Sequence, residues 1–414
     1  MVSGVVRDEI PGTMLLEPAV VDEPYVFYRR LVMEAPVWQV PGTPVVIVSS
    51  FAAVTEATNR VEDFSSNLRG LLYRTEDGLP GVLPFDAGEG ADALATADPP
   101  MHTVHRKAVF PELVARRMAT LRPEIEDLAE THMVAALSRT PVEFMDDIAN
   151  AIPIRVVSKL IGFHDEDPDE LLATAFGSTA MLAATESLDE INALMERSLA
   201  VFGWMNEQLV ERATDGTADG ILGAVRSAVA TGDLDVGAGL TIIHTLLSAG
   251  GESTTSLLGN AVYMLATIPD LQRQLRDEPT LVVPFIEEVL RLESPFRYHL
   301  RHVFHTTELC GVTIPAGSTM LLFWGAANRD PAEYERPDEV VLDRSTRRHH
   351  LAFGRGVHLC VGAPLARLEA EVILTEFLRR TTNFTLDPTH PPARLRSLMV
   401  RRFNSLPLVV SRSA

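Results

Sequence analysis

The spacing of apolar residues divides the chain into a β-containing start and a long helical middle. Valines at alternating and adjacent positions flank a Pro-Gly-Thr-Pro turn within residues 36–48, which predicts a hairpin. Residues 51–59 predict a short helix, whereas residues 68–100, rich in Gly, Pro, Asp and Glu, predict a long loop. Helical spacing then dominates residues 101–292. The pattern predicts a mainly α protein with a small β region.

A second β region is expected at residues 308–323. A strand and turn are indicated around residues 311–317, and an apolar strand follows at 320–323. We expect this region to pair with the N-terminal hairpin. The chain of 414 residues shows no internal repeat or low-complexity tract, and we expect one domain over residues 1–414.

The longest apolar run, residues 240–268, approaches the length of a membrane span. His244, Glu252 and Asn260 interrupt it, and no charged residues flank it as anchors. The run therefore predicts a buried central helix.

Composition and charge restrict the class of protein. Hydrophobic residues make up 46% and charged residues 22%, as in globular proteins. A net charge of -20 argues against nucleic acid as a partner, because a polyanion would be repelled. The two cysteines, Cys310 and Cys360, provide no disulfide framework and favour a reducing compartment. The first residues have neither a signal-peptide pattern nor a membrane anchor, so we expect a cytoplasmic protein.

The candidate chemistry is concentrated in residues 351–366. Phe353, Gly354 and Gly356 predict a tight turn in which both glycines permit positive φ. Helical spacing resumes directly afterwards, which places Cys360 just before a helix N-terminus, where a thiolate is favoured. A thiolate presented in this way suits haem iron. A buried structural cysteine beside a turn is the alternative interpretation.

The full pattern Phe-Gly-x-Gly-x-His-x-Cys-x-Gly resembles the haem-binding signature of the cytochrome P450 superfamily. The chain looks most like soluble actinobacterial members. The resemblance implies a triangular, mainly helical P450 domain that holds haem b (iron protoporphyrin IX) with Cys360 as the axial iron ligand. It implies further haem contacts from the same loop, at Phe353, Gly354, Gly356, His358, Gly362 and Ala366.

A second motif lies within the long apolar helix. Ala249 and Gly250 would contact the haem in the family pattern, and Glu252 takes the position of the family's acid. Ser253 takes the position of the alcohol, where the family usually has threonine; Thr254 is the candidate if the register is shifted by one residue. The resemblance implies that these side chains deliver protons to bound dioxygen.

Two further motifs occur in the expected order. His102 and Arg106 share one helix face, which is typical either of a solvated basic surface or, by resemblance, of donors to a haem propionate, together with Arg301 and His358. Glu288 and Arg291 resemble the family's structural ion pair. The arginine that commonly completes this pair is replaced by Glu339, so Arg336 and Arg344 remain candidates.

The implied activity is a haem-thiolate monooxygenase that hydroxylates a C–H bond of a small hydrophobic substrate. Electrons would come from NAD(P)H through a reductase and a ferredoxin. We expect Phe296, Tyr298, Leu247 and Met399 to line the substrate pocket, while the apolar residues 181–184 are explained equally well by core packing.

We expect a monomer with an acidic ferredoxin bound on the cysteine side, where basic residues gather. These are Arg344, Arg347, Arg348, His349, His350 and Arg355, with Arg106, Lys107, Arg116 and Arg117 nearby. A peroxide-driven oxygenase and a non-catalytic haem-binding or ligand-sensing protein are the alternatives.

Overall fold

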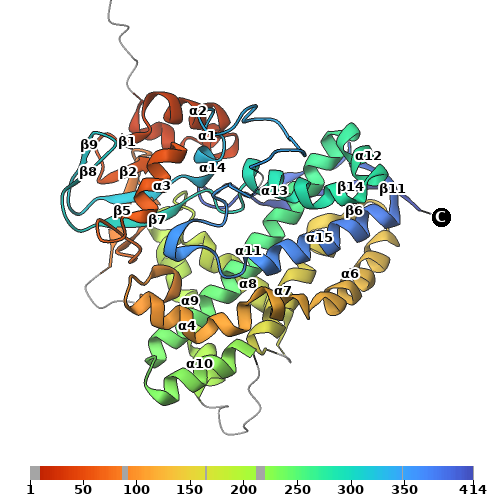
Figure 1. Cartoon of the computed structure of the whole chain (residues 1–414), viewed down its shortest axis with the longest axis horizontal. Helices are drawn as coiled ribbons and strands as arrows, with labels where there is room; N and C mark the ends of the chain where they lie inside the picture. Colours follow the sequence, from red (N-terminus) through yellow and green to blue (C-terminus); the bar gives the residue numbers. More distant parts are fainter. Residues whose placement is uncertain (1–9, 86–91, 164–165, 211–219, 347, 414) are drawn as a thin grey trace, which may run out of the picture.

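Helices make up most of the structure, as the apolar spacing predicted. The computed structural model describes residues 10–85, 92–163, 166–210, 220–346 and 348–413. Figure 1 shows the central helix α11 (Val236–Thr267) crossing the molecule among the other helices. The principal ones are α2 (Tyr25–Glu34), α3 (Phe51–Asn59), α4 (Met101–Leu113), α5 (Ala115–Ala119), α6 (Arg122–Leu137), α7 (Ala151–Ile161), α8 (Pro168–Ala180), α9 (Leu188–Val210), α10 (Gly220–Thr231), α12 (Pro269–Asp277), α13 (Val282–Leu292), α14 (Trp324–Ala327) and α15 (Ala363–Arg380).

Strands from both predicted β regions share one sheet. Its strand order is β1 (Val37–Gln39), β2 (Val45–Val48), β10 (Thr319–Leu322), β7 (His299–Val303) and β3 (Phe64–Ser65). The predicted N-terminal hairpin is the antiparallel pair β1–β2, and β10 runs parallel to β2. The expected pairing with the hairpin is therefore confirmed for β10, whereas it is wrong for the segment around 311–317, where β9 (Val312–Ile314) pairs with β8 (Thr307–Leu309) in a separate two-stranded sheet. Figure 1 shows this sheet on the side of the molecule opposite the C-terminus.

The predicted loop over residues 68–100 is partly wrong, because it contains a hairpin. Strand β4 (Gly70–Arg74) pairs antiparallel with β5 (Pro80–Pro84), and Tyr73 faces Gly81 across the pair. A Cβ atom on Gly81 would lie 2.4 Å from the Tyr73 ring, so a larger residue at position 81 would displace that ring. Glycine and proline, which suggested a loop, instead allow two short strands to meet.

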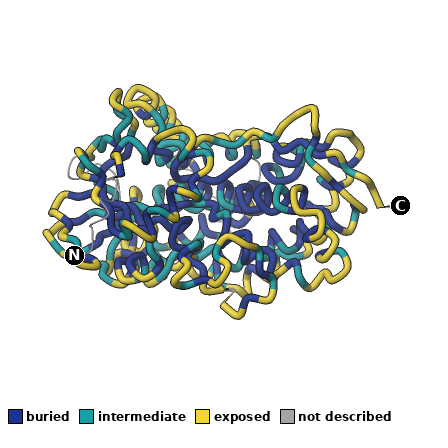
Figure 2. The backbone as a smooth tube through the Cα atoms, turned by 90° about the horizontal axis from the view of Figure 1, so that it is seen from above, coloured by how far each residue is buried: buried dark blue, intermediate teal, exposed yellow. Residues whose placement is uncertain are grey.

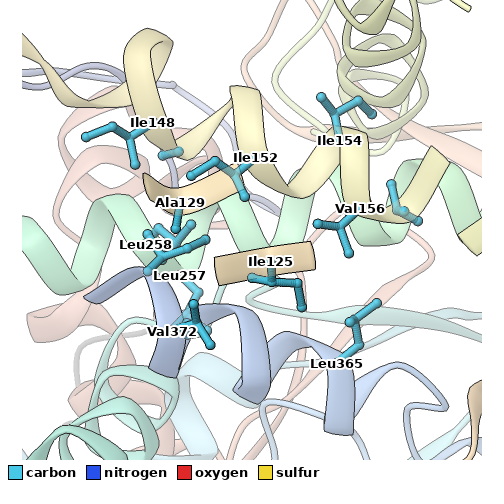
Figure 3. Close-up of a cluster of buried hydrophobic side chains, with 14 of the residues drawn as sticks. Ile125, Ala129, Ile148, Ile152, Ile154, Val156, Leu257, Leu258, Leu365 and Val372 are labelled. Carbon is cyan, nitrogen blue, oxygen red and sulfur yellow. The ribbon is translucent and has the colours of Figure 1, made fainter. Parts of the chain in front are cut away.

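The hydrophobic core surrounds α11. Figure 2 shows its turns as a buried column, with exposed chain around the periphery. Figure 3 shows part of this core, in which apolar side chains of α11 and of three other helices form one cluster. These are Leu257 and Leu258 of α11, Ile125 and Ala129 of α6, Ile152 and Val156 of α7, and Leu365 and Val372 of α15. The predicted buried helix is confirmed, and no helix in the described ranges is long and apolar enough to cross a membrane.

Two glycines of α11 let its neighbours approach closely. A Cβ atom on Gly250 would lie 2.7 Å from a methyl carbon of Val157 in α7, and one on Gly251 would lie 3.1 Å from Ile154. At these two positions α7 and α8 therefore pack directly against the backbone of α11.

Candidate active site

The cysteine loop has the predicted conformation. Gly354 and Gly356 have φ angles of 67° and 71°, in the left-handed region that glycine adopts without strain. The backbone N–H of Cys360 donates to the carbonyl of Phe353 at 2.9 Å, which closes the turn. Helix α15 begins three residues after the cysteine, with Gly362 as its N-cap. The loop therefore presents the Cys360 sulfur at the start of a helix.

Competing effects act on the thiol of Cys360. Its deep position raises the pKa, whereas the backbone N–H groups of Gly362 and Ala363, with Arg106 and Arg367, act to lower it. The side chain lies deep in the protein but is accessible from a cavity, whose wall it forms. The helix N-terminus supplies the donors that would stabilise a bound thiolate.

Two elements form much of the wall of this cavity. One is the cysteine loop with the start of α15, and the other is the middle of α11. From α11 the lining residues are Thr245, Leu246, Ala249, Gly250, Ser253, Thr254 and Leu257. From the loop they include Phe353, Gly354, His358, Cys360, Gly362 and Ala366. Gly356 is the one loop candidate that does not line it, although its backbone forms the turn.

Basic and imidazole side chains converge at one end of the cavity. His102, Arg106, Arg301 and His358 all line it, and the rings of His102 and His358 have centroids 4.3 Å apart. Burial, reinforced by Arg301, lowers the pKa of His358 to about 3. Burial also lowers the pKa of Arg301 to about 10, which Asp98 partly opposes. A site of this kind favours an anionic ligand.

These residues fit the carboxylates of a haem. The Nε2 atom of His358 lies 2.9 Å from Ser66 Oγ, but its buried Nδ1 atom has no hydrogen-bond partner among the described residues. Within the part of the chain that the structure describes, the Arg301 side chain donates only to the adjacent carbonyl of Leu300. Buried polar groups normally have partners, so a ligand carboxylate would satisfy these donors.

The comparisons with known proteins agree with this geometry. A family model described as Cytochrome P450 matches residues 227–403. "Cytochrome P450 144" of Mycobacterium tuberculosis is 40% identical over 391 residues, which cover 94% of this chain and 89% of that protein. The chain belongs to the cytochrome P450 family. It is therefore an oxidoreductase, a P450 monooxygenase, of a family that binds haem.

Two further P450 relatives extend this result. "Beta-dihydromenaquinone-9 omega-hydroxylase" of Mycobacterium tuberculosis is 31% identical, covering 95% of this chain and 78% of that protein. The solved structure of the P450 CYP109Q5 from Chondromyces apiculatus has a TM-score of 0.82 and 28% identity, covering 96% of this chain and 98% of that one. The predicted mainly α P450 fold is confirmed.

Ser253, the residue expected at the P450 alcohol position, reaches the cavity. It lines the cavity wall, and its hydroxyl donates to the Ala249 carbonyl at 2.6 Å. Thr254 also lines the wall, so the structure brings both candidates for the alcohol to the cavity that Cys360 borders.

Glu252 does not line this P450 cavity. Its carboxylate is fully buried on another side of α11, 2.7 Å from Arg402 Nε, and accepts a hydrogen bond from Thr179 Oγ1 at 2.9 Å. Consecutive helical residues point about 100° apart, so Glu252 and Ser253 face different neighbours. Burial raises the pKa of Glu252, and Arg402 opposes that shift.

The structural ion pair of the P450 pattern is a triad. Glu288 accepts from Arg291 at 2.8 and 2.9 Å and from Arg344 Nε at 3.1 Å. Arg336 is instead paired at the surface with Glu339, 3.8 Å away. Arg344 is thus the arginine that completes the pair, a choice that the sequence left open.

A second carboxylate cluster, which the sequence did not single out, adjoins the P450 cysteine loop. Glu287 is buried, accepts from Arg367 at 2.6 and 3.0 Å, and lies 2.9 Å from His350 Nε2. The Arg367 guanidinium also lies over the Phe353 ring at 4.5 Å. Adjacent glutamates at 287 and 288 were the only sequence signal, and such pairs are common on surface helices.

Three expected pocket residues do not line the P450 cavity. Leu247 is fully buried in the core around α11. Tyr298 stacks on Phe323 and donates from its hydroxyl to the Leu182 carbonyl at 2.6 Å, and Met399 packs in the same cluster. Tyr298 follows strand alternation, which directs it away from its neighbour His299. Phe296 and His299, both in the stretch 296–300 expected at the pocket, line the cavity, together with the unpredicted Trp324 and Glu369.

Proposed function

We propose that this monooxygenase hydroxylates a C–H bond of a small hydrophobic molecule, using haem b bound through Cys360. The observation that supports this most directly is the shared cavity. Cys360 borders it from the cysteine loop, and Ser253 and Thr254 border it from α11. A relative whose name describes an omega-hydroxylase agrees with hydroxylation as the reaction type. The haem, when bound, supplies the activation of dioxygen that these side chains support.

His102, Arg106, Arg301 and His358 hold the haem propionates in this proposal, and Ala249, Gly250 and Phe353 lie against the ring. Arg106 has a second task, since it donates to the carbonyls of Val357 and Leu359 in the cysteine loop. One side chain would therefore connect α4, the loop and a propionate. The Glu288 triad fixes the segment before the loop, and Glu287 fixes Arg367 and His350.

Proton delivery is the task we assign to Ser253, with Thr254 beside it. The single hydrogen of the Ser253 hydroxyl is donated to Ala249; to act, the hydroxyl would rotate this hydrogen toward an acceptor in the cavity and take up a replacement proton at Oγ. Glu252 is the acid that would resupply protons from the far side of α11. Its contacts with Arg402 and Thr179 mean that its carboxylate must leave this cluster, or act through intervening water, to reach Ser253.

Substrate would be held mainly by apolar contacts. The cavity wall carries Leu94, Leu113, Val157, Leu160, Ile221, Leu246 and Phe296, with few polar side chains among them outside the propionate end and the α11 hydroxyls. A ligand screen by haem spin-state shift, followed by product analysis, would identify the substrate class.

Electrons would enter from an acidic ferredoxin, reduced by NAD(P)H through a reductase. Lys107, Arg116 and Arg348 are exposed near the cysteine loop. Two expected contributors are excluded, because Arg344 and His350 are buried against Glu288 and Glu287. Arg347 lies outside the described residues. We further propose that the chain works as one domain and as a monomer in the cytoplasm.

The decisive test is haem ligation by Cys360. The reduced protein with carbon monoxide should show the thiolate-specific absorption band, and Cys360→Ala should lose it. Cys310→Ala is the matched control, because Cys310 lies in the turn between β8 (Thr307–Leu309) and β9 (Val312–Ile314), away from the cavity. A Cys360→Ala protein that keeps the band would reject the assignment.

A further inference from the structure

Trp324 fixes the orientation and tautomer of a histidine on the cavity wall. The indole Nε1–H of Trp324 donates to Nδ1 of His299 at 2.7 Å. An indole nitrogen can only donate, so Nδ1 must be the acceptor nitrogen of the ring. A neutral His299 then carries its hydrogen on Nε2. Burial lowers the pKa of His299 to about 4, which keeps the ring neutral near pH 7.

Among the described residues the Nε2–H of His299 has no hydrogen-bond partner, and the ring borders the cavity. Phe296 meets that ring edge-on, with centroids 5.8 Å apart, and Trp324 lies on another side at 5.9 Å. His299, Phe296 and Trp324 all line the cavity. The ring is thus held by two aromatic neighbours and by one hydrogen bond, and it retains one donor for a ligand.

The position of His299 in strand β7 determines which ligand group is in reach. His299 and Arg301 are two residues apart, so their side chains leave the same face of the strand about 6–7 Å apart. Arg301 and His358 line the same part of the cavity, and His358 is electrostatically influenced by both Arg301 and His299. A carboxylate, with two acceptor oxygens, matches two neighbouring donors better than a single carbonyl oxygen does.

We propose that His299 is a further hydrogen-bond donor to the haem propionate that Arg301 binds, and that Trp324 is the positioning residue that directs its Nε2–H toward the carboxylate. This inference rests on the proposed haem site. It assigns to His299 and Trp324, beside the expected pocket residue Phe296, a role in holding the cofactor rather than the substrate.

The test compares substitutions of similar length at one position. His299→Gln keeps an N–H donor near the position of Nε2, whereas His299→Met fills similar space without a donor. We expect His299→Met to lose haem to apomyoglobin roughly tenfold faster than the wild type, as loss of a hydrogen bond to a charged group implies, and to lower the ferric/ferrous reduction potential. His299→Gln should remain close to the wild type in both measurements.

Trp324→Phe provides an independent variant if His299→Met yields no holoprotein. It removes only the indole donor, which frees the imidazole to change tautomer, and it should fall between the wild type and His299→Met in the rate of haem loss. The inference is overturned if the folded variants lose haem at a rate within twofold of the wild-type rate and keep the wild-type ferric/ferrous reduction potential. It is also overturned if the variants differ from the wild type only in their ligand-induced spin-state shifts. Absence of the thiolate-specific band in the wild type would instead reject the proposed function.

Discussion

At the scale of single residues, Ser253 is the most informative departure from the family pattern. It lacks the methyl group of threonine, yet its hydroxyl is fixed by the bond to Ala249 and faces the cavity. The lost methyl normally restricts the rotamer. Here the intrahelical hydrogen bond to Ala249 restrains the hydroxyl without the methyl group.

We predict that Ser253→Ala uncouples the enzyme. Without a positioned hydroxyl, proton transfer slows, and product formed per NAD(P)H consumed should fall roughly tenfold or more while peroxide rises. Ser256→Ala is the matched control, because Ser256 makes the same type of bond to the Glu252 carbonyl, at 2.9 Å, and does not line the cavity. Equal coupling in both variants would show that Thr254 or water carries the proton.

The sequence identified residues of this site well where a motif fixes the spacing, and poorly where a side chain is directed by tertiary packing. Cys360, Ser253, His102 and Arg301 all reach one cavity, as the family resemblance implied. The sequence assigned no role to His299, because no short-range signal reveals that Trp324, in the later helix α14, lies beside it.

At the scale of secondary-structure elements, Glu252 connects three of them. Its carboxylate contacts Thr179 of α8 and Arg402 of the C-terminal segment, and the Arg402 guanidinium lies 3.8 Å from the centroid of the Phe176 ring in α8. The acid that the sequence assigned to proton transfer therefore also holds α8 against α11. No spacing rule predicts this contact, since Arg402 is distant in sequence.

We predict that Arg402→Met destabilises the fold by about 3–5 kcal/mol, because it leaves a buried carboxylate without its cation. Denaturant unfolding measures the loss. The double variant Glu252→Gln with Arg402→Met should recover a substantial part of it, since the buried charge is removed as well. Additive losses in the double variant would contradict an interacting buried pair.

A pH dependence follows from Glu287. His350 and Arg367 lower its pKa from 4.5 to about 2, against the effect of burial. A folded-state pKa below the unfolded value means that the stabilisation is present above about pH 4.5 and is lost as the pH falls toward 2. We predict that this acid-labile contribution, on the order of 3 kcal/mol, is absent from Glu287→Gln.

Denaturant unfolding of wild type and Glu287→Gln at pH 7 and at acid pH measures this difference. Glu371→Gln is the control, because that glutamate is on α15 with a surface partner, Arg122 at 2.8 Å. The free energies of unfolding of wild type and Glu287→Gln, plotted against pH, should converge as the pH falls from 4.5 toward about 2. Parallel curves would contradict the assignment.

At the scale of the whole molecule, charge is distributed unevenly. The chain has a net charge of -20, yet several cations gather near the cysteine loop. Arg106 binds the loop carbonyls from α4, which puts the adjacent, exposed Lys107 close to the loop. Helix α5, which carries exposed Arg116, packs against α15, the helix that follows Cys360. This surface would attract an acidic partner to the side from which the thiolate is approached.

We predict that Lys107→Glu with Arg116→Glu slows reduction by an acidic ferredoxin roughly tenfold at low ionic strength, because both charges steer the encounter rather than bind haem. The effect should shrink as salt is raised toward about 1 M, where the screening length falls to ~3 Å. Arg273→Glu is the control, an exposed arginine of α12, which Figure 1 places at the other end of the molecule from α4. The measurement is the rate of reduction by ferredoxin, followed by stopped flow at several salt concentrations. Electrostatic steering requires a salt-dependent loss of this rate in the double variant alone. An equal loss in Arg273→Glu would place the ferredoxin on another surface.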